Sequence, residues 1–255
     1  MAEPRQVIEL KNVSEIEILR KAGGYAAKVL KAVGEKVEPG VSTRFLDDIA
    51  AKEISSLGLK AGFLGYRGFP AATCISLNNE LVHGIPNDKR VLKEGDIVSV
   101  DLGLIYEGFY GDIACTFPVG KISADAQRLL DVTKRALDIA IDQVREGKRV
   151  GDLSWAVQSF VESKGFSVVR DYVGHGIGRK LHEEPSVPNF GKPGTGPRFS
   201  KGMVIAIEPM VNMGSYRVKT LKDGWTVVTE DGKLCAHFEH MVALTEKGAE
   251  VLTKE

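Results

Sequence analysis

Four acidic residues of this sequence lie inside or at the ends of apolar runs. Asp101 and Asp112 occupy two consecutive runs, and Glu208 and Glu239 occupy two runs nearer the carboxyl end. Each acid alone could be a core carboxylate satisfied by hydrogen bonds. Ionised carboxylates are seldom buried unless they are paired, however, so four of them in apolar runs require a shared counter-charge.

Divalent cations would supply that counter-charge. The runs that carry the acids contain almost no Lys or Arg that could pair with them. Four carboxylates and two divalent cations balance in charge, so repulsion between the acids becomes attraction through the metals. Carboxylate ligands suit Mn²⁺, Fe²⁺, Co²⁺ and Zn²⁺, and an imidazole ligand would favour these ions over Mg²⁺.

His175 is the best candidate for an imidazole ligand. It stands in the glycine-rich segment 174–178, where the glycines allow the backbone to approach a site closely. Arg179 occupies the place of the last glycine in a dinucleotide-binding fingerprint. A phosphate-binding loop is therefore the weaker interpretation.

The other histidines divide into two groups. His83 and His182 stand next to glycine and proline breaks; either could be an ordinary loop histidine, but a rigid, exposed placement suits proton transfer or substrate contact. His240 directly follows Glu239 and must face the opposite side of a strand, so we interpret it as structural. His237 shares the face of Glu239, but no motif assigns it a role.

Periodic helices and short β-branched strands must position these residues. Helical periodicity predicts four helices, at about 14–33, 42–54, 123–144 and 152–161. Ser14 and Glu17 form a capping-box signal for the first helix, and Asp152 can cap the fourth. Apolar runs predict buried strands at 95–101, 166–169, 204–211 and 234–244, and the segment 106–109 indicates a hairpin turn.

The helix pairs and the runs that follow them repeat at one offset. When the chain is shifted by 107 residues, Val37, Gly40, Leu46 and Gly58 match Val144, Gly147, Leu153 and Gly165. The same shift places 95–101 over 202–208. Two separate matches favour duplicated halves over a coincidence between amphipathic helices. Such a pseudo-twofold would bring Asp101 and Glu208 face to face on paired central strands.

The composition is that of an ordinary globular protein. The chain has 255 residues, of which 43% are hydrophobic and 27% charged. No linker rich in Pro, Gly or Ser separates the halves. We therefore expect one domain over residues 1–255 with a continuous sheet, its halves lying at roughly 10–120 and 121–252.

Charge and cysteine usage exclude several classes of partner. Lys plus Arg and Asp plus Glu number 34 each, so no overall field favours nucleic acid or an anionic membrane. No apolar run approaches the roughly 20 residues that span a bilayer, and the segment 1–6 lacks the apolar core of a signal peptide. Cys74, Cys115 and Cys235 have the spacing of free thiols in a reducing compartment. These features predict a cytoplasmic protein without a membrane or specific nucleic-acid partner.

The motifs resemble those of the type I methionine aminopeptidases over nearly the whole chain. The carriers are 65–70, 74–76, Asn78, 83–86, 95–98, 108–109, 111–112, 174–178, 182–185, 207–210, 223–226 and 239–240. The resemblance implies the pita-bread α/β fold, in which two pseudo-symmetric helix–helix–sheet halves surround a mainly antiparallel central sheet. It also implies hydrolytic removal of the amino-terminal methionine from proteins whose second residue is small.

The resemblance further implies a role for each site residue. It assigns two divalent metal ions (Co, Mn, Fe or Zn) to Asp101, Asp112, His175, Glu208 and Glu239, with Asp112 and Glu239 bridging. It gives His83 and His182 contact with the scissile amide, and makes Glu208 also the proton acceptor. It lines a methionine pocket with Phe63, Tyr66, Phe69, Cys74, Leu181 and Trp225. Phe69 and Leu181 depart from the tyrosine and phenylalanine that other members often carry. The expected partners are amino termini of nascent polypeptides at the ribosome, and the expected assembly is a monomer.

Three other functions compete with this interpretation. A prolidase or aminopeptidase P would share the fold and the metal ligands, but such enzymes usually carry an extra amino-terminal domain. A non-catalytic binding module with this fold would be expected to have lost ligands, and all five ligand types are present. A carboxylate-rich phosphohydrolase would require a phosphate-binding loop or an arginine clamp, and neither is evident.

Overall fold

A computed structural model of the chain describes residues 7–254, and the segment 1–6 that we examined for a signal peptide lies outside the described residues. The helices are α1 (Val13–Gly34), α2 (Thr43–Ser56), α3 (Ala124–Asp142) and α4 (Val150–Ser163), with a short 3₁₀ turn at Tyr66–Gly68. The strands of the first half are β1 (Lys60–Ala61), β2 (Thr73–Leu77), β3 (Glu80–Val82), β4 (Ile97–Tyr106) and β5 (Phe109–Pro118). Those of the second half are β6 (Ser167–Val168), β7 (Gly174–Gly176), β8 (Glu183–Val187), β9 (Val204–Ile207), β10 (Met210–Asn212), β11 (Val218–Thr220), β12 (Val227–Thr229), β13 (Cys235–His237), β14 (His240–Thr245) and β15 (Gly248–Val251).

All four predicted helices are present, but the predicted cap of α1 is wrong. Asn12 is the N-cap: its side chain accepts a hydrogen bond from the backbone N–H of Glu15, and the Glu15 side chain accepts one from the N–H of Asn12. Ser14 instead donates its hydroxyl to Asn12. Asparagine is as good an N-cap as serine, so the capping box forms two residues earlier than the Ser14–Glu17 signal indicated.

The predicted cap of α4 is also displaced. The helix begins at Val150, and Asp152 is its third residue. The Asp152 carboxylate accepts hydrogen bonds from the backbone N–H groups of Arg149 and Gly194, each at 2.8 Å. Asp152 thus satisfies a free donor at the helix start from inside the first turn, where a negative charge is favoured.

A long antiparallel hairpin is the centre of the first half. β4 pairs with β5 along its whole length, and β1 and β2 pair with β4. The predicted hairpin turn is confirmed: Glu107 and Gly108 both have positive φ, which suits the right-handed twist of the two strands. Asp101 lies in the middle of β4, because the strand continues to Tyr106 beyond the predicted end.

The second half repeats this arrangement with interrupted strands. The predicted strand 204–211 is divided into β9 and β10, and the predicted strand 234–244 is divided into β13 and β14. Pro209 has no backbone N–H to donate to a ladder, which accounts for the first break. Glu208 and Glu239 occupy the two breaks, so their side chains project from irregular backbone between paired strands.

The central pairing differs from the predicted one. The described strands form a four-stranded, a five-stranded and two three-stranded sheets, so the expected continuous sheet is wrong. β4 and β9, the strands of Asp101 and Glu208, are not direct neighbours. β5 and β14 lie between them and meet at a single bridge, Ala114 to Glu239. Asp112 therefore lies on the central strand β5, and Glu239 directly precedes the central strand β14.

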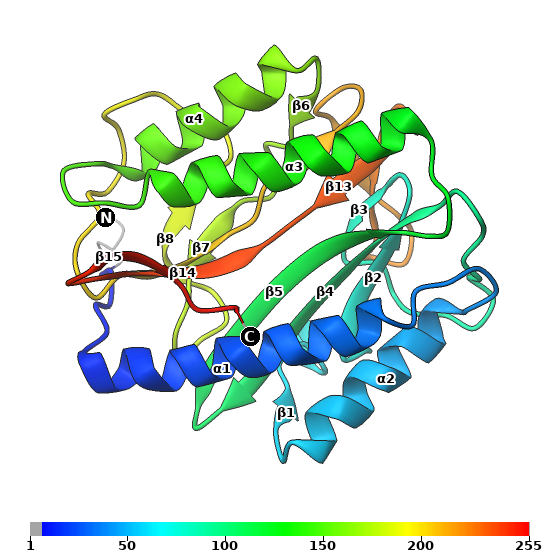
Figure 1. Cartoon of the computed structure of the whole chain (residues 1–255), viewed down its shortest axis with the longest axis horizontal. Coiled ribbons are helices and arrows are strands. Elements are labelled where there is room, and N and C mark those ends of the chain that lie inside the picture. Colours follow the sequence, from blue (N-terminus) through cyan, green and yellow to red (C-terminus); the bar gives the residue numbers. More distant parts are fainter. Residues whose placement is uncertain (1–6, 255) are drawn as a thin grey trace.

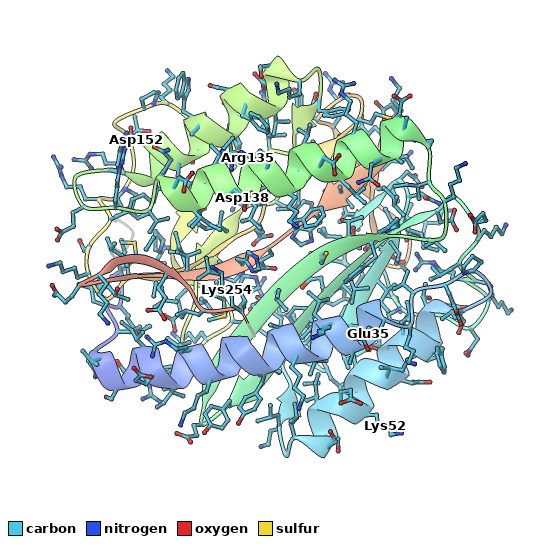
Figure 2. All side chains as sticks on the ribbon, in the orientation of Figure 1. Glu35, Lys52, Arg135, Asp138, Asp152 and Lys254 are labelled. Atoms are coloured by element: carbon cyan, nitrogen blue, oxygen red, sulfur yellow. The ribbon has the colours of Figure 1, made fainter. Side chains whose placement is uncertain are left out.

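Each helix pair covers the strands of its own half. In Figure 1 the α1–α2 pair and the α3–α4 pair lie on the near side of the strands, on either side of β5 and β14. The apolar faces of α1 and α2 form one core cluster with β4 and β5, and those of α3 and α4 form another with β9 and β14. Figure 2 shows charged side chains at the end of α1 (Glu35), on α2 (Lys52) and on α3 (Arg135), and all three are exposed. None of the helices described is long and apolar enough to cross a membrane.

Candidate metal centre and substrate pocket

The two central strands bring Asp112 and Glu239 together. The backbone N–H of Glu239 donates to the carbonyl of Ala114 at 2.9 Å, which fixes Glu239 beside β5. Asp112 and Glu239 are 2% and 3% exposed. One carboxylate oxygen of each, Asp112 Oδ1 and Glu239 Oε1, is buried without a hydrogen-bond partner among the described residues. Two buried, unsatisfied acceptors at one point indicate a missing positive partner.

His175 directs a lone pair at these acids. Its Nδ1 lies 2.9 Å from the carbonyl of Gly176, which can only accept, so Nδ1 carries the proton. Nε2 is then unprotonated, and it lies 3.8 Å from Asp112 Oδ2 and 3.5 Å from Glu208 Oε1. A lone pair that faces ionised carboxylate oxygens is repelled unless a cation lies between them. A metal-ligating histidine typically donates the N–H of its other ring nitrogen to a carbonyl or carboxylate, as His175 does here through Nδ1.

Glu208 and Asp101 complete the cluster from opposite halves. Glu208 is anchored through its carbonyl, which accepts a hydrogen bond from the Asn189 side chain at 2.9 Å. Asp101 Oδ1 is a third buried acceptor without a partner among residues 7–254. Ligand atoms of Asp112, His175 and Glu239 all lie within 4.8 Å of one another, a spacing that one metal ion can bridge.

Because the four acids of this cluster are buried, their ionisation depends on a nearby cation. Burial raises the pKa of Asp112 to about 7. Burial, followed by the charge of Asp112, raises the pKa values of Asp101, Glu208 and Glu239 well above their usual range. Burial lowers the pKa of His175 to about 3, so the ring is neutral near pH 7. Without added positive charge the acids would hold protons; divalent cations would let them ionise, and the donor set fits such ions.

His182 and His83 lie at the edge of the cluster. The Nδ1 of His182 is hydrogen-bonded to the Tyr66 hydroxyl at 2.7 Å, and its ring centroid lies 4.3 Å from that of His175. Burial and then the charge of Arg67 lower the pKa of His182, whereas burial lowers that of His83 to about 4. Both rings are therefore neutral near pH 7 and can donate or accept a hydrogen bond.

Aromatic and aliphatic side chains form an apolar wall within the pocket. Phe69 and Trp225 meet edge to face with ring centroids 5.1 Å apart. The Asp223 carboxylate holds Trp225 in place: it accepts hydrogen bonds from the backbone N–H groups of Trp225 and Thr226 and from the Thr226 hydroxyl. The 223–226 motif is thus a local turn that presents the indole to the pocket.

The structure gathers every site residue that the sequence analysis singled out. A single pocket with about 480 Å³ of empty space is lined by Phe63, Tyr66, Phe69, Cys74, His83, Asp101, Asp112, His175, Leu181, His182, Glu208, Trp225 and Glu239. The lining combines titratable groups with aromatic and aliphatic groups. A pocket of this kind can present a polar reacting group to metal ions while it holds an apolar side chain.

His237 lies beside the site, although no sequence motif assigns it a role. His237 is 2% exposed, and neither ring nitrogen has a hydrogen-bond partner among the described residues. Its Nε2 lies 3.8 Å from Glu208 Oε2. The available signal was its position two residues before Glu239, on the same strand face. His240 is structural as predicted: its Nδ1 is hydrogen-bonded to the Thr253 hydroxyl.

Comparison with known proteins identifies the family. The model of metallopeptidase family M24 matches residues 17–246, which is most of the chain. The chain belongs to metallopeptidase family M24. A methionine aminopeptidase of Clostridium perfringens is 53% identical over 247 residues, a match that covers 97% of this chain and 99% of the relative.

Solved structures of M24 relatives agree with the fold. The crystal structure of a methionine aminopeptidase from Thermotoga maritima superposes with a TM-score of 0.96 at 49% identity, covering 98% of this chain and all of that one. A prolidase from Pyrococcus furiosus gives a TM-score of 0.78 at 25% identity, and the match covers 96% of this chain but 65% of the prolidase. The predicted pita-bread fold is confirmed, and the prolidase is the longer protein, as the sequence analysis expected.

Proposed function

We propose that this chain removes the amino-terminal methionine from polypeptides by metal-dependent hydrolysis. The observation that carries the proposal is the pocket itself, in which a buried carboxylate–histidine cluster faces an apolar wall. Similarity to methionine aminopeptidases along nearly the whole chain supports the same activity. Membership of a metallopeptidase family implies that the reaction depends on a divalent metal.

Five side chains would hold two divalent ions. The family resemblance makes Asp112 and Glu239 the proposed bridging ligands; Asp112 lies on β5, and Glu239 is joined to β5 by the bridge to Ala114. Asp101, His175 and Glu208 would complete the set. Four carboxylates balance two divalent charges, and the donors suit Co, Mn, Fe or Zn. When bound, such ions supply Lewis acidity and make a water molecule acidic near neutral pH.

Three residues of the chain would handle the proton and the peptide bond. Glu208 lies within reach of the cluster and of His237, and it would accept a proton from the attacking water and deliver it to the departing amine. A Tyr66 hydroxyl that donates to His182 Nδ1 leaves Nε2–H free to donate to the scissile carbonyl. His83, which lies near Trp225 in the pocket lining, would hold the substrate amide.

The apolar wall would select the first residue. Phe63, Phe69, Cys74 and Leu181 are all at most 8% exposed, and with Tyr66 and Trp225 they form a narrow apolar slot. An unbranched thioether fits such a slot through dispersion and sulfur–aromatic contacts. Charged or β-branched side chains would fit poorly. We further propose that only substrates with a small second residue pass the histidines at the rim.

The proposed substrates are nascent polypeptides in the cytoplasm. An amino-terminal methionine is exposed while its chain is still being made, so we propose that the protein acts at the ribosome. The balanced charge of the chain gives no support for binding to nucleic acid in general. We propose that the protein acts as a monomer.

The proposal is tested by release of free methionine from peptides of the Met-Gly-Met and Met-Pro types. The metal-free protein would be supplied in turn with Co²⁺, Mn²⁺, Fe²⁺ and Zn²⁺. We expect methionine release from Met-Gly-Met with at least one of these ions and none without metal. Hydrolysis confined to X-Pro bonds would instead indicate a prolidase-type activity, and absence of hydrolysis with every ion would indicate a binding module.

A further inference from the structure

The segment 178–182 carries two of the proposed site residues on backbone without regular structure. It joins β7, which holds His175, to β8, and it contains Leu181 and His182. Its backbone hydrogen bonds are few: Gly178 accepts one from Tyr110 N–H at 2.8 Å and donates a long one to Lys180. A bend held this weakly does not by itself fix the direction of the His182 ring.

A buried ion pair closes this bend. Glu183, the residue after His182, accepts a hydrogen bond from the backbone N–H of Lys180 at 3.0 Å through Oε1. Its other oxygen, Oε2, lies 2.6 Å from Nζ of Lys11. The Lys11 and Glu183 side chains are 4% and 7% exposed. A charge pair at this depth is little screened by solvent, so it restrains both partners more than a surface pair would.

Backbone contacts fix Lys11 in turn. Its N–H donates to the carbonyl of Gly202 at 2.7 Å, at the turn that leads into β9. The lysine side chain passes directly over Gly178, where a Cβ atom would lie 2.7 Å from Lys11 Nζ and 2.8 Å from Glu183 Oε1. The ion pair therefore spans the bend between an anchored lysine and a glycine that leaves room for it.

We infer that the Lys11–Glu183 ion pair is a positioning device for His182, which it holds at the orientation that meets the scissile carbonyl. Lys11 precedes α1 and lines no part of the pocket, so it touches neither substrate nor metal ligands. The Tyr66 hydroxyl restrains the ring at Nδ1, and the ion pair restrains the backbone that carries it. The inference rests on the role proposed above for His182.

Arg20 provides a matched control. It lies on α1, close to Lys11 in sequence, and pairs with Glu250 at 2.6 Å. That pair is more exposed, at 37% and 35% of the two side chains, and among the described residues neither partner forms a hydrogen bond or ion pair with Lys11 or Glu183. Arg20→Met therefore removes an ion pair from the same helix region without disturbing the proposed positioning device.

The test is a double-mutant cycle that uses methionine release from a Met-Ala peptide. We expect Lys11→Met to lower kcat by about 10-fold or more, since a shift of about 1 Å at a catalytic group can cost up to 100-fold. KM and bound metal should change little, and Arg20→Met should leave kcat unchanged. Lys11→Arg, which keeps the charge, should restore most of the rate. In the His182→Ala background, Lys11→Met should cost less than about twofold, because the group that it positions is gone.

Each outcome separates the inference from the proposed function. An equal loss from Lys11→Met in both backgrounds would show that the pair serves stability alone and would overturn the inference. A His182→Ala variant with full activity would instead refute the proposed role of His182. If Lys11→Met does not fold, the cycle is run with Glu183→Gln, which removes the charge and keeps an acceptor for Lys180 N–H. NMR resonances of the His182 ring should shift in Lys11→Met and not in Arg20→Met.

Discussion

Unsatisfied acceptors are the main signature of the site at the scale of single residues. Asp101, Asp112 and Glu239 each bury an oxygen without a partner among the described residues, and His175 turns an unprotonated nitrogen toward the same point. Each buried polar atom without a hydrogen bond costs about 1–3 kcal/mol, so three at one place would be expensive unless a ligand satisfied them. The site is thus built at a cost in stability that metal binding would offset.

Asp112→Asn should nearly abolish turnover. The substitution removes charge from a proposed bridging ligand, and a misplaced ion should lower kcat on the order of 10³-fold or more. Metal bound per chain, measured on the purified variant, should fall as well. Asp131→Asn, on the exposed face of α3, is the control and should behave like the parent protein. Near-normal activity of Asp112→Asn with a full complement of metal would refute the ligand assignment.

Trp225→Ala should weaken recognition of methionine without weakening metal binding. The indole forms part of the apolar wall through its contact with Phe69. Because one methylene in an apolar pocket is worth about 1–3 kcal/mol, we expect KM for Met-Ala peptides to rise by about 10-fold or more. In the parent protein norleucine should be accepted and leucine less so, and rates should fall steeply from Met-Gly and Met-Ala to Met-Lys and Met-Glu. Equal rates for Met-Lys and Met-Ala would favour a broad-specificity aminopeptidase.

At the scale of elements, α1 packs closely against the backbone of β5 and of the segment at Leu252. This close packing determines the position of the helix on the sheet. Gly23 on α1 faces the carbonyl of Leu252, and a Cβ atom there would lie 2.5 Å from that oxygen. Gly111, next to Asp112 on β5, faces the Ala22 carbonyl at the same distance. Glycine at these two positions lets the helix pack directly on backbone, which brings β5 and its carboxylate to their place in the core.

Two adjacent glycines of α1 should therefore respond in opposite directions to alanine. Gly23→Ala forces α1 away from Leu252 and should destabilise the protein by about 1–3 kcal/mol. At Gly24 the added methyl would lie 3.5 Å from the nearest atom, an ordinary contact. Gly24→Ala should then stabilise the helix by about 0.5–1 kcal/mol. Denaturant unfolding of both variants, in the presence of metal, measures the difference; two changes of the same sign would contradict this packing.

At the scale of the whole molecule, the buried cluster should make the stability of the metal-free protein fall as pH rises above about 6.5. The folded-state pKa values of the four acids are raised, so the folded state binds more protons than the unfolded one, and its advantage is lost as pH rises through those values. The pKa values of the histidines are lowered, so the histidines make stability rise with pH. This opposing effect operates only below about pH 6.5, where the imidazoles of the unfolded chain titrate.

Thermal unfolding between pH 6.5 and 8 tests this dependence. We expect Tm of the chelated protein to fall across the window, since Asp112 titrates at about 7. The metal-loaded protein should be more stable at each pH and should lose less, because its carboxylates are already ionised and paired with cations. A chelated protein whose Tm rises with pH would show that the acids are not held protonated by burial.

Local sequence determined the helices, the central hairpin and the identity of the candidate ligands. The four helices follow from the 3.6-residue apolar period, and the turn at Glu107–Gly108 follows from Gly108, which accepts positive φ without steric cost. Acids in apolar runs pointed to metal because burial of charge is costly wherever the runs lie in space. The helix caps were displaced because several neighbouring polar side chains could cap equally well, and local geometry chose among them.

Only the tertiary structure decided which strands are neighbours and what surrounds each ligand. The repeat indicated that the two halves face one another, but β5 and β14 are central because Glu239 forms a bridge with Ala114, a contact between residues far apart in sequence. The place of His237 beside Glu208 and the Lys11–Glu183 pair also join distant segments. The periodicity of apolar residues predicts which side of a helix or strand is buried, but it does not identify the element that packs against that side. These contacts therefore depend on the packing of the whole chain.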